Sequence, residues 1–302
     1  MKKYMKPWSF SMLFILLMIG IFWNCIQLNQ PSLRPIASRE KYALNDELAV
    51  SDLHVRKGML ALNRKEFDRA EDHFKVALKA FQTNLGEKDR RYFGTLRMLG
   101  RTYLWSNRTN EAEKTLLQAL EISRSVLGDD HSDTIDAYND LGGCYVKKEE
   151  WKKAITILEL VRDNYRRNLG EEHVSYAATL NNLGWVHFKA ENFEVSEPLF
   201  RQTLAIYRKK FGEVSPYTAD CYEKLARLMV ATGRFEQAEQ LFRFALAVNE
   251  RTLDSSDENL ALCMDGFSAL LHLKGKHSEA GKLEERAKAI RSQSSKSGSL
   301  RK

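Results

Sequence analysis

The chain has 302 residues, of which 43% are hydrophobic and 29% charged, so it is long and apolar enough to bury a substantial core. Its net charge of +7 arises from 47 basic and 40 acidic residues that are interspersed, with part of the excess at the two ends. Nucleic-acid binding needs a concentrated basic stripe that displaces counterions, so this charge pattern argues against a nucleic-acid partner.

The N-terminal region begins with a short basic end at residues 1–7, followed by an uncharged apolar run at residues 8–28 (WSFSMLFILLMIGIFWNCIQL). About 20 such residues span a bilayer as a helix. Lys2, Lys3 and Lys6 precede the run, and the positive-inside rule places them in the cytoplasm. The sequence therefore predicts a signal-anchor: a single-pass membrane protein with a cytoplasmic N-terminus and an extracytoplasmic repeat domain, which is periplasmic in a bacterium.

Two alternatives for this segment stay open. A cleaved signal peptide has the same charged start and apolar centre, although this run exceeds the usual apolar length and no small-x-small site follows it directly. Lipidation of Cys25 would need a small residue before the cysteine, where Asn24 stands. Residues 29–50, which contain Pro31 and Pro35, are predicted to form a linker and a lead-in helix.

The rest of the chain repeats every 42 residues. A column of small residues consists of Gly58, Gly100, Gly142, Gly184, Ala226 and Ser268, and a second column consists of Ala70, Ala112, Ala154, Ser196, Ala238 and Ala280. The phrases LGEK, LGDDH, LGEEH and FGEV recur at the same interval. This period predicts six copies over residues 51–290, which start near residues 51, 93, 135, 177, 219 and 261. The polar residues 291–302 that follow predict a disordered tail.

Each copy has the pattern of two amphipathic helices. In the second copy, Leu96, Leu99 and Tyr103 fall at helical spacing in the first helix, as Ala112 and Leu116 do in the second. The small-residue column lets the two helices approach closely, and the glycine of the LGxx phrase suits the left-handed end of a helix. One helix pair cannot bury its own apolar face, so the copies are expected to stack into one continuous core.

The columns L-G-x-x-Y (Leu99, Gly100 and Tyr103, for example), with alanine twelve residues after the glycine, resemble tetratricopeptide repeats (TPRs). The usual TPR unit has about 34 residues. The longer period, the LGxxH phrases and LNNLG at 180–184 resemble the 42-residue kinesin-light-chain subtype. The resemblance implies an all-α fold, a right-handed α-α superhelix of about six helix-turn-helix repeats, here behind a transmembrane helix. It also implies a concave groove that binds a protein or an extended peptide.

The groove is expected to be lined by the first helix of each copy, on the side that does not pack. This rule selects Arg97, Arg101, Asn139, Lys147, Asn181, Asn182, Trp185, Lys189 and Arg227. Asparagine amides can donate to and accept from a peptide backbone, arginine and lysine attract carboxylates, and Trp185 offers a rigid apolar contact. The alternative is that these are ordinary solvated polar residues.

Other chemistry finds little support. GxSxG, P-loop, HExxH and GxGxxG phrases are absent from the sequence, so no catalytic residue, no enzyme activity and no cofactor is predicted. His131 and His173 lie beside acidic residues but recur with the repeat, which favours helix capping and loop packing over a metal site. Cys144, Cys221 and Cys263 are predicted core residues rather than disulfide partners.

Together these patterns predict a membrane-anchored TPR scaffold or adaptor that binds a partner protein or peptide in its concave groove. Two further functions stay open at this point. One is a structural assembly protein that associates with itself and binds no peptide ligand. The other is a regulator that sequesters an enzyme. A fold alone does not choose among these functions.

Overall fold

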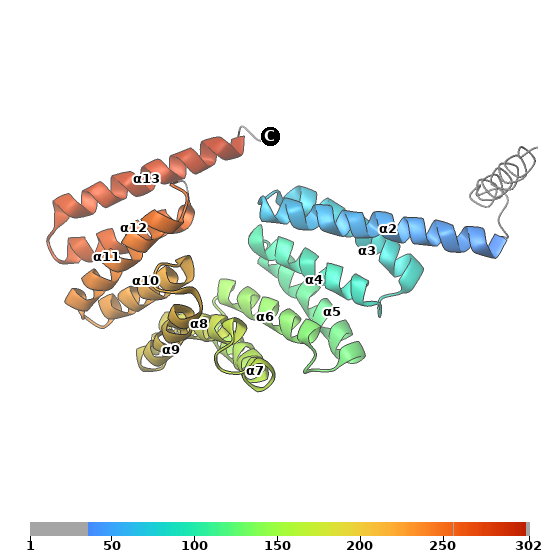
Figure 1. The fold of residues 1–302 in the computed structure, drawn as a ribbon, viewed down its shortest axis with the longest axis horizontal. Helices are drawn as coiled ribbons and strands as arrows, with labels where there is room; N and C mark the ends of the chain where they lie inside the picture. The colour runs from blue at the N-terminus through green and yellow to red at the C-terminus, as the bar shows by residue number, and fades with distance from the viewer. Residues whose placement is uncertain (1–35, 256, 300–302) are drawn as a thin grey trace, which may run out of the picture. The chain divides into compact units, whose positions relative to one another are not determined.

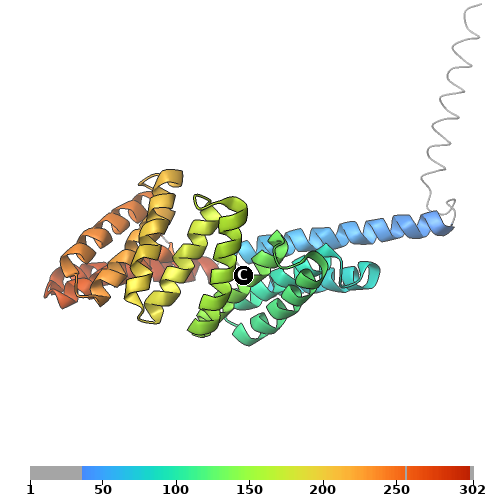
Figure 2. The same cartoon turned by 90° about the horizontal axis from the view of Figure 1, so that it is seen from below.

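The computed structural model describes residues 36–255 and 257–299, and within them every element of regular structure is an α-helix (Figures 1 and 2). The chain divides into two compact units, Met1–Thr102 and Tyr103–Lys302, and the boundary falls inside α4. The helices of the first unit are α2 (Ile36–Asn63), α3 (Phe67–Leu85) and most of α4 (Arg90–Trp105). Those of the second are α5 (Thr109–Leu127), α6 (Ser132–Lys147), α7 (Trp151–Leu169), α8 (Val174–Lys189), α9 (Phe193–Phe211), α10 (Pro216–Ala231), α11 (Phe235–Thr252), α12 (Glu258–Leu273) and α13 (His277–Ser299).

The 42-residue period of the sequence is visible in the helix starts. The first helices of the second to sixth repeats begin at Arg90, Ser132, Val174, Pro216 and Glu258. The second helices of the six repeats begin at Phe67, Thr109, Trp151, Phe193, Phe235 and His277. The prediction of an all-α helical repeat solenoid is therefore confirmed, whereas the right-handed sense of the superhelix stays a prediction.

The helix ends follow from residues that recur with the period. Gly86 and Gly170, which follow second helices, have φ of 82° and 85°, the left-handed region that glycine enters without strain. His131 and His173 precede first helices, and each Nδ1 accepts a hydrogen bond from the backbone N–H two residues later at 3.1 Å. Each imidazole thus caps a helix N-terminus, which confirms the predicted capping role.

The core lies between the two helices of a repeat and beneath the next repeat. At Gly184 a Cβ atom would lie 2.8 Å from the Phe200 ring, so only glycine allows α8 and α9 to approach this closely. Phe200 is fully buried and belongs to one apolar cluster with Leu225 and Met229 of α10. Cys144, Cys221 and Cys263 are buried free thiols, as predicted for core residues.

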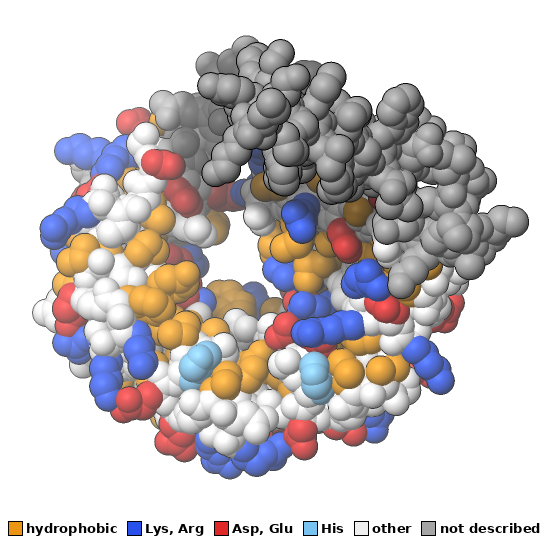
Figure 3. All heavy atoms as spheres, turned by 45° about the vertical axis from the view of Figure 1, so that its right-hand side comes forward, with side chains coloured by type: hydrophobic (Ala, Val, Ile, Leu, Met, Phe, Trp, Pro, Cys, Tyr) orange, Lys and Arg blue, Asp and Glu red, His pale blue; other side chains and the backbone are white. Residues whose placement is uncertain are grey.

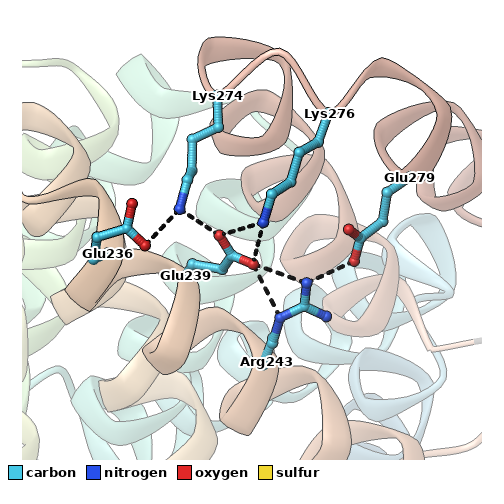
Figure 4. Close-up of polar contacts among 6 residues, drawn as sticks. All are labelled: Glu236, Glu239, Arg243, Lys274, Lys276 and Glu279. Atoms are coloured by element: carbon cyan, nitrogen blue, oxygen red, sulfur yellow. Dashed lines mark hydrogen bonds and ion pairs between the residues drawn. The ribbon is translucent and has the colours of Figure 1, made fainter.

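Ion pairs also join successive repeats, and the pattern was not anticipated from the sequence. Glu239 of α11 accepts hydrogen bonds from Lys274 at 2.6 Å and from Lys276 at 2.8 Å, both in the turn between α12 and α13 (Figure 4). Arg243, one turn along α11, donates to the same carboxylate at 2.8 Å. Lys148 with Glu113 and Arg234 with Glu197 repeat the link between earlier repeats. The carboxylate near the start of a second helix thereby binds the turn of the following repeat.

The membrane topology needs correction. Within residues 36–255 and 257–299 no helix is long and apolar enough to cross a membrane. The physical reason is that these helices carry charged side chains along their length and turn their apolar faces to neighbouring helices. This finding contradicts the predicted localisation as a single-pass membrane protein and leaves the predicted membrane partner without support. The run at 8–28 itself lies outside the described residues.

The two ends of the repeat region differ from the expected boundaries. α2 runs without interruption from Ile36 to Asn63, so the lead-in segment and the first helix of the first repeat are one helix. Its N-terminal part projects past the other helices of its unit (Figures 1 and 2). At the other end α13 continues to Ser299, beyond residue 290 where the last repeat was expected to stop.

Candidate functional site

A pocket of about 530 Å³ opens in the second unit among α8, α10, α11 and α12. Its lining residues are Trp185, Pro216, Tyr217, Asp220, Glu223, Lys224, Arg227, Asn249, Leu253, Asn259 and Leu262. α10 contributes most of the floor because residues 216, 220, 223, 224 and 227 fall at steps of three and four along one helical face. The site therefore combines aromatic and aliphatic walls with a polar helical stripe.

The charges of this stripe are paired within α10. Lys224 Nζ lies 2.7 Å from Asp220 Oδ2, and an Arg227 guanidinium nitrogen lies 2.8 Å from Glu223 Oε1, both at a spacing of four residues. Arg227 also donates to the backbone carbonyl of Leu262 at 3.0 Å, which connects α10 to α12. Two carboxylates and two cations line the pocket, so its charges are balanced.

Burial changes the acidity of Glu223. The carboxylate retains only 15% of its side-chain exposure, and this desolvation raises its pKa above the ordinary value. The charge of Arg227 beside it opposes the shift. The Glu223–Arg227 pair is thus a largely buried ion pair within α10, and Glu223 fixes the position of the Arg227 guanidinium.

Asn181 lies behind the pocket rather than in its lining. It is 8% exposed, and its Nδ2 donates to Asp220 Oδ2 at 2.9 Å. Its buried Oδ1 has no hydrogen-bond partner among the described residues. The amide predicted to contact a peptide is therefore used inside the protein, where it positions a carboxylate of the pocket.

The remaining predicted groove residues are distributed as follows. Trp185 stacks on Phe188 with ring centroids 5.3 Å apart, and the Lys189 ammonium lies 5.9 Å from the Trp185 ring. Lys147 donates to the carbonyl of Leu104 at 2.7 Å. Asn182 is exposed and Asn139 half-buried, both in the second unit, whereas the half-buried Arg97 and Arg101 belong to the first unit. Of the predicted set, Trp185 and Arg227 line the pocket.

The sequence rule missed the lining residues of α11 because it considered only first helices. It missed those at the start of α12 because it selected no residue from the sixth repeat. Asn249, which is 4% exposed, occupies a column that holds Phe81, Tyr165 and Tyr207 in three other repeats and Ser123 in the second. Asn249 and Leu253 both line the pocket. Asparagine at a position that is aromatic in three repeats is the sequence signal for this wall, but Ser123 shows that the signal is not specific.

The surrounding surface is mixed in charge. On the face shown in Figure 3, basic and acidic side chains of the described residues are interspersed with apolar ones.

The described helices and the pocket define a helical repeat protein with a mixed polar and apolar site in its second unit. The family model described as tetratricopeptide repeat matches residues 49–125, 91–167, 133–209, 186–250 and 217–293. These matches cover most of the chain, and the chain belongs to the tetratricopeptide repeat family. None of the curated protein sequences compared with the chain matches it.

Solved structures share this architecture. BtubC (BKLC) from P. vanneervenii is 21% identical, with 83% of this chain and 92% of that chain covered and a TM-score of 0.57. A kinesin light chain with TPR-like repeats from Podosopora anserina is 22% identical, with coverage of 68% and 96% and a TM-score of 0.56. A Rap protein in complex with competence and sporulation factor is 15% identical, with coverage of 97% and 90% and a TM-score of 0.58. The predicted resemblance to kinesin-light-chain repeats is confirmed, and at these identities the likeness concerns the fold.

Proposed function

We propose that this protein is a TPR scaffold or adaptor that binds a segment of a partner protein in the pocket among α8, α10, α11 and α12. The observation that carries the proposal is the pocket itself, with a volume of about 530 Å³ and an aromatic, aliphatic and amide lining. Sites that bind ligands commonly combine an apolar lining with a few well-placed polar groups. The Rap protein of similar fold, which was solved with competence and sporulation factor, supports a binding role for such a solenoid.

The chemistry of the lining favours one kind of contact. Trp185, Leu253 and Leu262 offer apolar surface, and Asn259 offers an exposed amide beside it. The cations Lys224 and Arg227 already have carboxylate partners, so an acidic ligand would have to displace Asp220 or Glu223. Affinity should therefore come mainly from burial of an apolar side chain and from amide hydrogen bonds to a peptide backbone.

The test is co-purification with crosslinking from the native cell, comparing the intact chain with a Trp185→Ala, Leu262→Ala variant. The amount of the specific partner that co-purifies with the variant should fall at least about tenfold, since aromatic and aliphatic anchors in a pocket dominate binding. A Leu160→Ala variant is the matched control, because Leu160 is also exposed, at 41%, but lies on α7 outside the pocket. Identical partners for all three proteins, at unchanged helicity, would contradict the proposal.

A further inference from the structure

Three columns of the repeat carry the contact between one repeat and the repeat before it. Cys144 on α6 has its Sγ 3.4 Å from the backbone oxygen of Thr109 on α5. Cys221 on α10 belongs to one buried cluster with Tyr207 on α9. Tyr176 on α8 occupies a third such column, and the cluster that contains it also packs against Tyr165 on α7, the second helix of the preceding repeat. These columns of a first helix therefore face the second helix of the preceding repeat.

The same columns are buried in every later repeat. Their members on α4 to α12 are Tyr92, Thr134, Tyr176, Thr218 and Leu260 in one column, Thr95, Ala137, Thr179, Cys221 and Cys263 in the next, and Thr102, Cys144, Val186, Leu228 and Leu270 in the last. All of these residues are at most 6% exposed. Burial at these columns is thus a constant feature of the fold from the second repeat to the sixth.

On α2 the equivalent residues are Val50, Leu53 and Leu60, which are 54%, 47% and 56% exposed. No described helix precedes α2, and this explains why Val50, Leu53 and Leu60 are exposed. It does not explain why these exposed residues are apolar. An end repeat ordinarily turns a polar outer face to solvent, because it has no neighbour to cover it. α2 instead has apolar side chains on the face that, in all later repeats, packs against the preceding helix. An exposed apolar face of this kind is typical of a surface that binds another helix.

The opposite end of the array cannot supply that partner. The column of Tyr207, which packs against the next repeat, holds Arg291 on α13, and the column of Leu246 holds Lys288. Both residues are exposed, and Arg291 forms an ion pair with Asp265. A head-to-tail contact between copies would bury these cations against Leu53 and its neighbours at a large desolvation cost.

We propose that the exposed face of α2 is a homodimer interface, in which α2 of one copy packs antiparallel against α2 of a second copy. Residues 46, 50, 53, 57 and 60 follow steps of three and four and so share one helical face. A twofold contact uses the same patch on both copies, so the patch has to be complementary to itself.

The face of α2 meets this requirement. With the twofold axis between residues 51 and 52, Val50 of each copy lies opposite Leu53 of the other. The same register places the exposed Asp46 opposite the exposed Lys57, which occupies a column that is Leu or Phe in every later repeat. A charged residue within an apolar seam sets register and orientation in paired helices. The two Asp46–Lys57 pairs would therefore fix the antiparallel arrangement around a four-residue apolar centre.

The test measures the mass of the full-length chain by analytical ultracentrifugation from about 1 to about 200 µM, a range that covers weak contacts formed by one helix pair. The wild type should reach twice the 34.9 kDa of the chain as concentration rises. Leu53→Glu places two carboxylates in the seam and should weaken dimerisation by at least about 100-fold. Its far-UV circular dichroism should stay unchanged, because Leu53 is already 47% exposed in one copy.

Val76→Glu is the matched control, because Val76 on α3 is 50% exposed in a column that is exposed in every repeat. It should dimerise like the wild type. Asp46→Lys or Lys57→Asp alone should weaken the dimer roughly tenfold, since each places like charges opposite one another twice per dimer. The double exchange should restore it. A monomer at every concentration, a Leu53→Glu variant that dimerises normally, or a double exchange no better than the single ones would overturn the proposal.

Discussion

The fourth and sixth repeats solve the same packing problem with opposite chemistry. The same four columns hold Gly184, Phe188, Phe193 and Phe200 in the fourth repeat and Ser268, His272, His277 and Glu284 in the sixth. Phe200 is fully buried beneath α10, whereas the Glu284 side chain is 41% exposed and no described helix follows α13. The difference teaches that a column is apolar where a following repeat covers it and polar where none does.

The polar side chains of these columns in the sixth repeat bind one another. Glu284 Oε1 accepts from Ser268 Oγ at 3.1 Å and lies 3.0 Å from His272 Nε2. The rings of His272 and His277 lie 5.3 Å apart, where the fourth repeat has Phe188 and Phe193 at 5.8 Å. Polar side chains that bind one another can thus replace an aromatic cluster on the same backbone.

The largest expected effect concerns the fourth repeat, in which the next repeat covers Phe200. Phe200→Ala removes a fully buried ring from the cluster that joins α9 to α10 and should reduce the free energy of unfolding by about 3–5 kcal/mol. Glu284→Ala, at the equivalent position, should cost much less, because that side chain is 41% exposed and its contacts with Ser268 and His272 are screened by solvent. Urea unfolding of both variants measures the difference, and equal losses would show that α13 is covered in solution.

A smaller effect tests how polar groups join the fifth repeat to the sixth. Hydrogen bonds from Lys274, Lys276 and Arg243 lower the pKa of Glu239 from 4.5 to about 2. A carboxyl whose pKa falls on folding stabilises the protein above its unfolded pKa, and this contribution is lost as the pH falls from about 4.5 to about 2. Glu239→Gln should therefore cost about 1 kcal/mol near neutral pH, a modest value because salt and solvent screen the partly exposed cations.

The measurement is chemical denaturation of wild type and Glu239→Gln at pH 7, pH 4 and pH 3. The two stabilities should converge toward acid, as the wild-type carboxylate becomes protonated. A difference that is constant over this range would mean that Glu239 contributes by packing and not by charge. Glu250→Gln removes a carboxylate that is paired with Arg286 and is 38% exposed, more than Glu239 at 11%, and it is the control for a general effect of one lost carboxylate.

The same comparison shows what the sequence could and could not predict. The period, the helix pairs and the need for glycine at position 184 followed from local residue types, because one helix pair repeats the same contacts every 42 residues. The pocket did not follow, because Trp185, Tyr217 and Asn259 come from the fourth, fifth and sixth repeats and meet only after stacking. Asn181 satisfied the rule for a groove residue, but its side chain donates to Asp220 and is buried. Asp220 lies 39 residues further along the chain, so the local sequence around Asn181 could not indicate this contact.

The smallest expected effect concerns the helix caps of the same two repeats. α8 begins after His173, whose Nδ1 accepts from Ser175 N at 3.1 Å, and α12 begins after Asp257, whose carboxylate accepts from Asn259 N at 2.8 Å. His173→Ala removes the acceptor and should cost about 0.5–1 kcal/mol. His173→Asp transfers the cap of the sixth repeat into the fourth and should restore this loss, because a carboxylate also interacts favourably with the positive end of the helix dipole. Thermal unfolding of the three proteins measures the order, and an Asp variant no more stable than the Ala variant would show that the imidazole contributes through loop packing rather than through its hydrogen bond.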